Sequence, residues 1–247
     1  MQIATFDFHN TVAHCDPWFE LEIRTLPAAV LNRLAGGQGD PAIAGKVTEH
    51  YRALRKDVIA TGIERDAQFC VAHVFAALGV HLAADELSGH IDALMRDCLI
   101  SLSPVPGAVE TISSLIDADI PVGIISSAVY HPFLEWSLAQ FGIRDRLAFV
   151  ATSASIGYYK SVPTIYELAY GLVDADPALG VHIGDSPRWD IEVAQRAGLA
   201  AVLYEPGRQT PPVDHSFSPA LTLETLVDAH IPITSLLDQR RARAVVV

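Results

Sequence analysis

The sequence of 247 residues has few lysines, few cysteines and too little basic charge to balance its acidic residues. Seventeen Lys and Arg stand against 29 Asp and Glu, so the formal net charge is −12, and only Lys46, Lys56 and Lys160 are lysines. Binding to nucleic acid or to an anionic membrane depends on a basic surface, so we expect neither as the main partner. The three cysteines include no C-x-x-C pair, which suggests neither a disulfide framework nor a thiolate zinc site and fits a reducing cytoplasm.

Long hydrophobic runs are missing as well, although half of the residues are hydrophobic and the mean hydropathy is +0.28. No stretch reaches the roughly 18 uncharged apolar residues of a membrane span. The first residues carry no basic region of a secretion signal, and Asp7 interrupts their apolar run. We therefore expect a soluble, cytoplasmic, compact protein with one large domain, or with one full domain that carries a smaller one.

Short apolar segments alternate with amphipathic helical patterns on both sides of one long helical block. The chain after the first apolar segment has apolar residues at helical spacing from about residue 16 to 102. Short, nearly continuous apolar strands separated by helices indicate a parallel sheet that is covered on both faces. The segments that we predict as strands are 2–8, 120–125, 148–150, 181–183 and 200–204.

The predicted fold is therefore a doubly wound α/β core of the Rossmann type, built from residues 1–14 and 103–247. An all-helical cap, residues 15–102, is inserted over the carboxyl edge of the sheet, where open α/β sheets bind ligands. In the tail, a short helical pattern covers residues 221–229, and the Arg240 to Arg243 cluster is expected to be a solvated end. We assign no chemistry to residues 208–247.

Polar side chains follow four of the predicted strands, at the point where each strand ends. Because the carboxyl ends of parallel strands point the same way, these groups can converge in one crevice. Two carboxylates with backbone oxygens suit Mg²⁺, and an amine with a hydroxyl can hold phosphate oxygens. A remaining carboxylate can attack phosphorus and form an aspartyl-phosphate that water then hydrolyses. In chain order the groups are Asp7 with His9, Asn10 and Thr11, then Ser126 with Ser127, then Lys160, then Asp185 with Asp190.

These residues, taken in this order, resemble the motifs of the haloacid dehalogenase-like hydrolases that carry a helical cap between their first and second motifs. The resemblance covers roughly residues 3 to 205. It implies a Mg²⁺-dependent phosphatase that acts on a small phosphorylated metabolite beneath a closing cap. The implied catalytic residues are Asp7, His9 and Lys160; the phosphate-binding residues are Asn10, Thr11, Ser126, Ser127 and Lys160; the metal ligands are Asp7, His9 through its backbone carbonyl, Asp185 and, in support, Asp190.

His9 departs from the family pattern, in which phosphatases usually carry an aspartate two residues after the nucleophile as general acid and base. A histidine near its reference pKa of ~6.5 could take that role. If His9 cannot, the expected loss is ~10²- to 10⁴-fold. The alternatives are a catalytically impaired binding or regulatory protein, a dehalogenase, and a phosphonate hydrolase that uses Lys46 or Lys56. Retention of Asp185 and Asp190 favours phosphoryl chemistry, and we expect a monomer or a homodimer.

Overall fold

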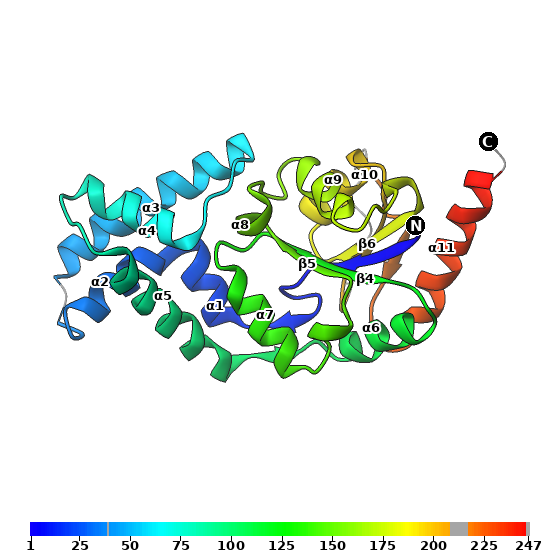
Figure 1. The fold of residues 1–247 in the computed structure, drawn as a ribbon, viewed down its shortest axis with the longest axis horizontal. Helices are drawn as coiled ribbons and strands as arrows, with labels where there is room; N and C mark the ends of the chain where they lie inside the picture. Colours follow the sequence, from blue (N-terminus) through cyan, green and yellow to red (C-terminus); the bar gives the residue numbers. More distant parts are fainter. Residues whose placement is uncertain (39, 208–216, 246–247) are drawn as a thin grey trace.

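The computed structural model describes residues 1–38, 40–207 and 217–245. A six-stranded parallel sheet forms the centre of the core, in the order β5-β4-β1-β6-β7-β8 (Figure 1). β1 lies between β4 and β6, and all residues of these three strands are buried, as their nearly continuous apolar sequences predict. The strands are β1 Ile3–Phe6, β4 Val122–Ser126, β5 Phe149–Thr152, β6 Gly180–Gly184, β7 Ala200–Tyr204 and β8 Leu221–Leu223.

Helices cover both faces of this sheet and bury two separate apolar clusters. Ala4 and Ile124 belong to the larger cluster, whereas Ile3 and Ile125, their neighbours along the strands, belong to the second. This alternation follows from the pleat of each strand, and it gives the core three layers, so the α/β fold class is confirmed. On one face lie α6 Ala108–Asp117, α7 His131–Gln140 and α11 His230–Val245; on the other lie α8 Ser153–Ile156, α9 Thr164–Gly171 and α10 Val193–Arg196.

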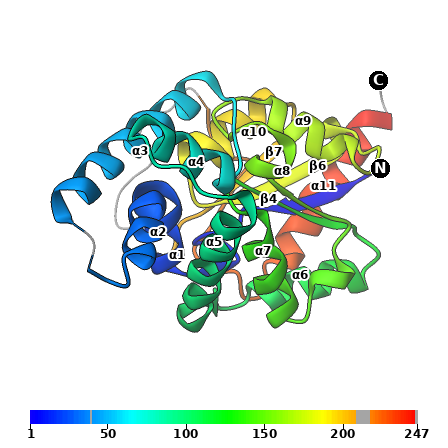
Figure 2. The same ribbon diagram turned by 60° about the vertical axis from the view of Figure 1, so that its left-hand side comes forward.

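A block of helices lies beyond the carboxyl ends of the central strands (Figures 1 and 2). We call residues 15–102 the helical insertion. The chain enters it through β2 (Ala13–His14) and leaves through β3 (Ser103–Pro104), which pair antiparallel as a two-stranded ribbon. Its elements are α1 Asp16–Glu20, a π-helical turn Leu21–Thr25, α2 Leu26–Leu34, α3 Pro41–Thr61, α4 Ala67–Ala77, α5 Ala84–Cys98 and a 3₁₀ turn Leu99–Ser101.

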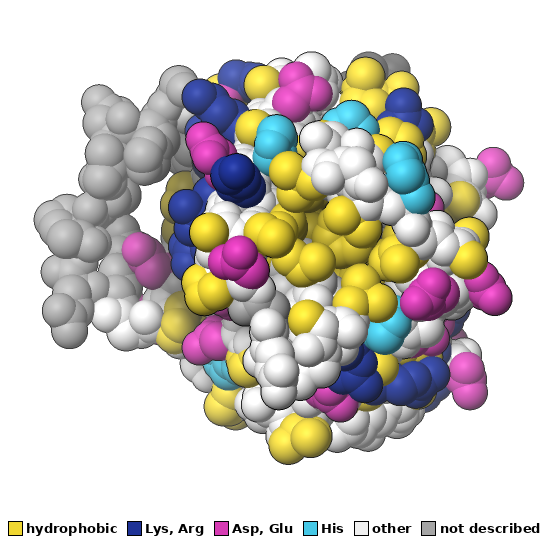
Figure 3. All heavy atoms as spheres, turned by 90° about the vertical axis from the view of Figure 1, so that its left-hand side faces the viewer, with side chains coloured by type: hydrophobic (Ala, Val, Ile, Leu, Met, Phe, Trp, Pro, Cys, Tyr) yellow, Lys and Arg dark blue, Asp and Glu magenta, His cyan; other side chains and the backbone are white. Residues whose placement is uncertain are grey.

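The insertion is attached to the core by an aromatic stack. The ring of Trp18, on α1, meets Phe8 edge-on at 5.6 Å and stacks on Phe133, on α7, at 4.8 Å. Seen end-on, the insertion has apolar side chains over the middle of its face and basic side chains around the rim, with a group along the left edge and another at the lower right (Figure 3). Among the described residues, no helix has both the length and the apolar character needed to cross a membrane.

The tail differs from its prediction in one respect. The helix predicted over residues 221–229 is wrong, because residues 221–223 pair with β7 in parallel as the edge strand β8, and the helix α11 begins only at His230. Asp228, with φ of 56°, lies in the left-handed region between the two elements and interrupts any helical run. The Arg240 side chain, predicted to be solvated, donates to the Gly198 carbonyl at 2.7 Å and so ties α11 to the core.

Candidate functional site

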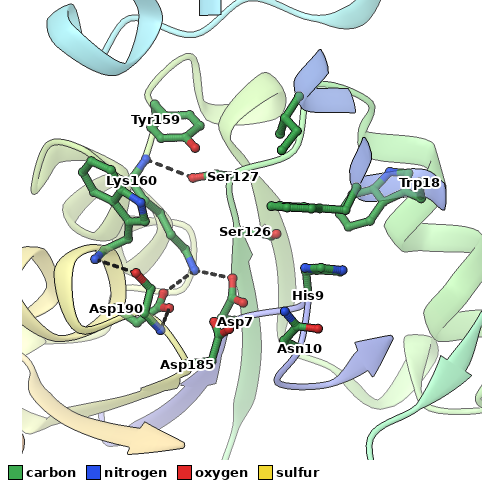
Figure 4. A pocket seen from close by; sticks show the side chains of 14 residues that line it. Asp7, His9, Asn10, Trp18, Ser126, Ser127, Tyr159, Lys160, Asp185 and Asp190 are labelled. Carbon is green, nitrogen blue, oxygen red and sulfur yellow. Dashed lines mark hydrogen bonds and ion pairs between the residues drawn. The ribbon is translucent and has the colours of Figure 1, made fainter. Parts of the chain in front are cut away.

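The polar residues at the strand ends converge in one pocket of about 260 Å³ between the core and the helical insertion (Figure 4). It opens at the carboxyl end of β1. The strands β4 and β5 lie on one side of β1 and the later strands β6 to β8 on the other, and open α/β sheets bind ligands at such a switch point. The residues that line it are Asp7, His9, Asn10, Trp18, Phe19, Ile23, Ser126, Ser127, Tyr159, Lys160, Asp185, Ser186, Trp189 and Asp190.

The pocket contains every predicted site residue except Thr11. Thr11 is fully buried and lines no part of the pocket, and its hydroxyl has no hydrogen-bond partner in the described part of the chain. The aromatic walls were not predicted, because Trp18 and Phe19 have the sequence pattern of core residues. Trp18 is indeed buried at 1% exposure, yet one side of it still faces the pocket.

Asp7 follows β1 directly and is fixed by its backbone, whose N–H donates to the Ile183 carbonyl at 2.8 Å. Its carboxylate oxygen Oδ1 lies 2.5 Å from Nζ of Lys160. Burial, helped by the charges of Asp190 and Asp185, raises the pKa of Asp7 to about 8, although Lys160 lowers it. The carboxylate form of Asp7, which a nucleophile needs, therefore depends on positive charge placed beside it.

Lys160 joins Asp7 to Asp190, since Nζ lies 2.7 Å from Oδ1 of Asp190 as well. The same oxygen is 3.2 Å from Nε2 of His182, and Oδ2 of Asp190 accepts from the Ser186 N–H at 3.0 Å. Burial opposes ionisation, but Lys160 and His182 hold the pKa of Asp190 below its usual range. Although burial lowers the pKa of Lys160, Asp190 and Asp7 outweigh this and raise it, so an ion pair is maintained.

His182, which the sequence does not single out, contacts Asp190 from behind the pocket. It is fully buried within β6, and its Nδ1 lies 3.0 Å from the Thr5 hydroxyl, which orients the ring toward Asp190. Burial lowers the pKa of His182 to about 4, so the ring is neutral at physiological pH. A histidine inside an otherwise apolar strand was the available signal, because buried polar groups require partners.

The turn after β6 brings Asp190 back to the strand end. A Cβ added at Gly184 would lie 2.3 Å from Cγ of Asp190, so only glycine allows this approach. The Ser186 hydroxyl caps the following π-helical turn, Pro187–Glu192, by accepting from the Trp189 N–H at 3.2 Å. The positions of Asp185 and Asp190 thus follow from the local sequence Gly-Asp-Ser-Pro.

Three carboxylates, those of Asp7, Asp185 and Asp190, offer oxygen atoms within 4.8 Å of one another. One lysine balances only part of their charge, and burial with the Asp190 charge raises the pKa of Asp185 to about 6. Both oxygens of Asp190 are already engaged, so Asp7 and Asp185 are the carboxylates best placed to bind an ion directly. This all-oxygen, negatively charged set fits a hard divalent cation.

His9 lies at the pocket wall among aromatic rings. Its imidazole stacks on Phe19 at 4.2 Å with an interplanar angle of 6°, and Trp18 lies 5.8 Å away. Nε2 is buried without a hydrogen-bond partner among the described residues, since Oδ1 of Asp16 is 3.8 Å away. Burial lowers the pKa of His9 to about 4, which corrects the expected value near 6.5.

The remaining polar groups border the space beside Asp7. Ser126 is the last residue of β4. The hydroxyl of Ser127, which follows it, accepts from the Lys160 N–H at 3.2 Å and so connects the end of β4 to the loop that carries Lys160. Asn10 has φ of 60°, a left-handed conformation that asparagine tolerates better than most residues. Of the two lysines of the insertion, Lys56 lines a neighbouring hollow and Lys46 lines neither.

The sequence matches a family model described as haloacid dehalogenase-like hydrolase over residues 1–198. The chain therefore belongs to the haloacid dehalogenase-like hydrolases. Among the curated proteins to which it is similar, three match it over part of its length, and it covers less than half the length of each of these three. These are haloacid dehalogenase-like hydrolase domain-containing protein 3 of Bos taurus (32% identity; 39% of this chain, 38% of the relative), ribulose-1,5-bisphosphate 5-phosphatase of Halopiger xanaduensis (28%; 48% and 49%) and phosphoglycolate phosphatase of Rhodobacter capsulatus (30%; 44% and 48%).

Solved structures share the fold over almost the whole chain. A 2-haloacid dehalogenase from Pseudomonas syringae superposes with a TM-score of 0.67 at 20% identity, covering 95% of this chain and 98% of that one. A phosphatase of the same family from Thermococcus onnurineus superposes with a TM-score of 0.59 at 20% identity, covering 94% and 97%. Because one fold carries both reactions in these neighbours, the reaction has to be argued from the site.

Proposed function

We propose that this hydrolase is a Mg²⁺-dependent phosphatase that cleaves a small phosphorylated metabolite through an aspartyl-phosphate on Asp7. The observation that supports it best is the cluster of Asp7, Asp185 and Asp190 around Lys160 at the end of β1. A dehalogenase needs the attacking carboxylate but no group of metal-binding carboxylates. The retained Asp185 and Asp190 therefore favour phosphoryl transfer.

In this proposal Asp7 attacks phosphorus, the bond from phosphorus to the leaving oxygen breaks, and water later cleaves the aspartyl-phosphate. Lys160 orients Asp7 and offsets the charge of the phosphoryl oxygens, and Ser126 and Ser127 donate hydrogen bonds to them. Mg²⁺, when bound, would be held by Asp7, Asp185 and the backbone carbonyl of His9, and would supply positive charge beside the phosphoryl group. The His9 side chain, two residues after Asp7, is the candidate general acid and base. Burial lowers its pKa to about 4, so the free imidazole is neutral and can accept the proton of the attacking water.

A small substrate suits the pocket, whose volume of about 260 Å³ is near the lower end for ligand sites. The helical insertion contributes Trp18, Phe19 and Ile23 to its wall, so we propose that the insertion acts as a cap that excludes water during the reaction. The net charge of −12 argues against nucleic acid as a substrate.

The direct test is turnover of p-nitrophenyl phosphate by the wild type and by Asp7→Asn, each with and without Mg²⁺. The wild type should require the metal, and Asp7→Asn should lose at least about 10³-fold in kcat because the substitution removes the proposed nucleophile. Asp119→Asn is the matched control, since Asp119 is an exposed aspartate outside the pocket. Metal-independent turnover, or full activity in Asp7→Asn, would contradict the proposal.

A further inference from the structure

A second hollow of about 420 Å³ lies on the helical insertion, beside the pocket that Asp7 lines. The two share Phe19, Ile23 and Tyr159 in their walls, so they are direct neighbours. Beyond these apolar walls, the second hollow is lined by four basic side chains, which are Arg24, Arg52, Arg55 and Lys56.

Two of these four cations are already neutralised. Arg55 is buried and makes two hydrogen bonds to the carboxylate of Glu64, at 2.6 and 2.9 Å. Arg24 lies 2.6 Å from the carboxylate of Glu20, one turn earlier.

Arg52 and Lys56 are different, because both are exposed and neither forms an ion pair within the described parts of the chain. They lie four residues apart on α3, hence on the same helix face, where two like charges repel each other. The chain as a whole carries a net charge of −12 and has only three lysines. In so acidic a chain, the composition alone does not predict two unpaired cations next to the pocket.

Hydrogen bonds hold the C-terminal end of α3 next to the loop that carries Lys160. The Tyr159 N–H donates to the Gly62 carbonyl at 2.8 Å, directly after α3 ends, and Tyr159 precedes Lys160 in the chain. Glu64 accepts from the Ser153 hydroxyl at 3.0 Å and so fastens the same end of α3 to the core. These contacts hold the C-terminal end of α3 against the loop that carries Lys160.

We propose that the second hollow binds a second anionic group of the substrate through Arg52 and Lys56. Resting on the proposed phosphatase function, this names the substrate class: a phosphomonoester whose leaving group carries a carboxylate or a second phosphate at the end of a short apolar spacer. The spacer lies along Phe19, Ile23 and Tyr159. Guanidinium and ammonium groups recognise both kinds of oxyanion by charge-assisted hydrogen bonds.

Binding of non-hydrolysable phosphonates to the wild-type protein in Mg²⁺, measured by titration calorimetry, tests the proposal without turnover. The probes are alkylphosphonates of two to five carbons, each compared with the equally long compound that ends in a carboxylate or in a second phosphonate. The best doubly anionic probe should bind at least about tenfold more tightly than its alkyl partner, as charge-assisted bonds would give. The anion with the larger gain identifies the terminal group.

The double variant Arg52→Gln with Lys56→Gln should reduce this gain to about twofold or less and leave the alkylphosphonate affinity unchanged. Lys46→Gln is the matched control, since Lys46 is exposed on the same helix but lines neither hollow. Equal binding of charged and uncharged probes by the wild type, or a gain that survives in the double variant, overturns the proposal. Turnover of p-nitrophenyl phosphate, which has no second anionic group, is measured separately: its absence would overturn the phosphatase function, while a binding gain that depends on Arg52 and Lys56 would still support the anion site.

Discussion

A buried carboxyl group outside the pocket, that of Glu22, should lower the stability of the protein as the pH rises from 5 to 8. Glu22, in the π-helical turn of the insertion, accepts hydrogen bonds from the N–H groups of Val129 and Tyr130, at 3.2 and 3.0 Å, in the core loop after β4. Its side chain is buried in this junction. Burial raises the pKa of Glu22 to about 8, although the two N–H bonds and Arg55 lower it.

The direction of this pH dependence follows from the number of protons that the folded and unfolded chains bind. Between its ordinary pKa of 4.5 and about 8, the folded protein keeps the Glu22 proton while the unfolded chain has released it. Stability is therefore fully present below pH 4.5 and is lost as the pH rises through 8. At about 1.4 kcal/mol per pKa unit, the loss between pH 5 and pH 8 is about 3 to 4 kcal/mol, a large share of a typical unfolding free energy of 5–15 kcal/mol.

Glu22→Gln replaces the carboxyl group by an amide of nearly the same shape that does not titrate. Because the amide NH2 of Gln faces one of the two N–H donors, the variant should lose about 1–3 kcal/mol at every pH. In urea titrations at pH 5, 6, 7 and 8, its unfolding free energy relative to the wild type should therefore rise by about 3 kcal/mol from pH 5 to pH 8. Glu20→Gln is the control, since the Glu20 side chain is half exposed and only pairs with Arg24. Wild-type and Glu22→Gln stabilities that run parallel from pH 5 to pH 8 would refute the reasoning.

Three further predictions concern the catalytic centre. Gly184→Ala places a Cβ 2.3 Å from Cγ of Asp190. It should lower the unfolding free energy by about 1–3 kcal/mol and kcat at least tenfold. Gly89→Ala, with open space around its Cβ, is the control and should lower neither. Lys160→Met leaves Asp7 and Asp190 without their shared cation; thermal unfolding should show a loss of about 3–5 kcal/mol, and an unchanged melting temperature would count against the ion-pair assignment. His9→Asp should lower kcat for p-nitrophenyl phosphate by ~10²- to 10⁴-fold if histidine is the working acid and base; a large gain from a negligible wild-type rate would instead mark the natural site as impaired.

Most of the core could be predicted because its strands are short apolar runs that end in polar residues. A parallel sheet places all such ends at one edge, so the sequence predicts Asp7, Ser126, Lys160 and Asp185 together. Lys160 reaches this edge from the loop after α8, eight residues beyond the end of β5. The edge strand β8 was missed, because three residues carry too little pattern to distinguish a strand from a helical turn.

The properties of the site that depend on the insertion could not be predicted from sequence. The pKa of His9 is set by burial beside Phe19, and nothing in the spacing of these two residues indicates that their rings stack. In the same way, Arg52 and Lys56 look like a solvated helix face until the orientation of α3 relative to the pocket is known. Tertiary contacts, rather than local pattern, determine both.

The central claim is that Asp7 attacks phosphorus. An acid-quenched single turnover of a phosphomonoester with Mg²⁺, followed by mass spectrometry of the peptide that contains Asp7, tests it most directly. We predict a peptide heavier by one phosphoryl group, with the modification on Asp7 and absent from Asp7→Asn. Turnover that leaves Asp7 unmodified at every quench time, or a phosphoryl group found on another residue, would contradict the account.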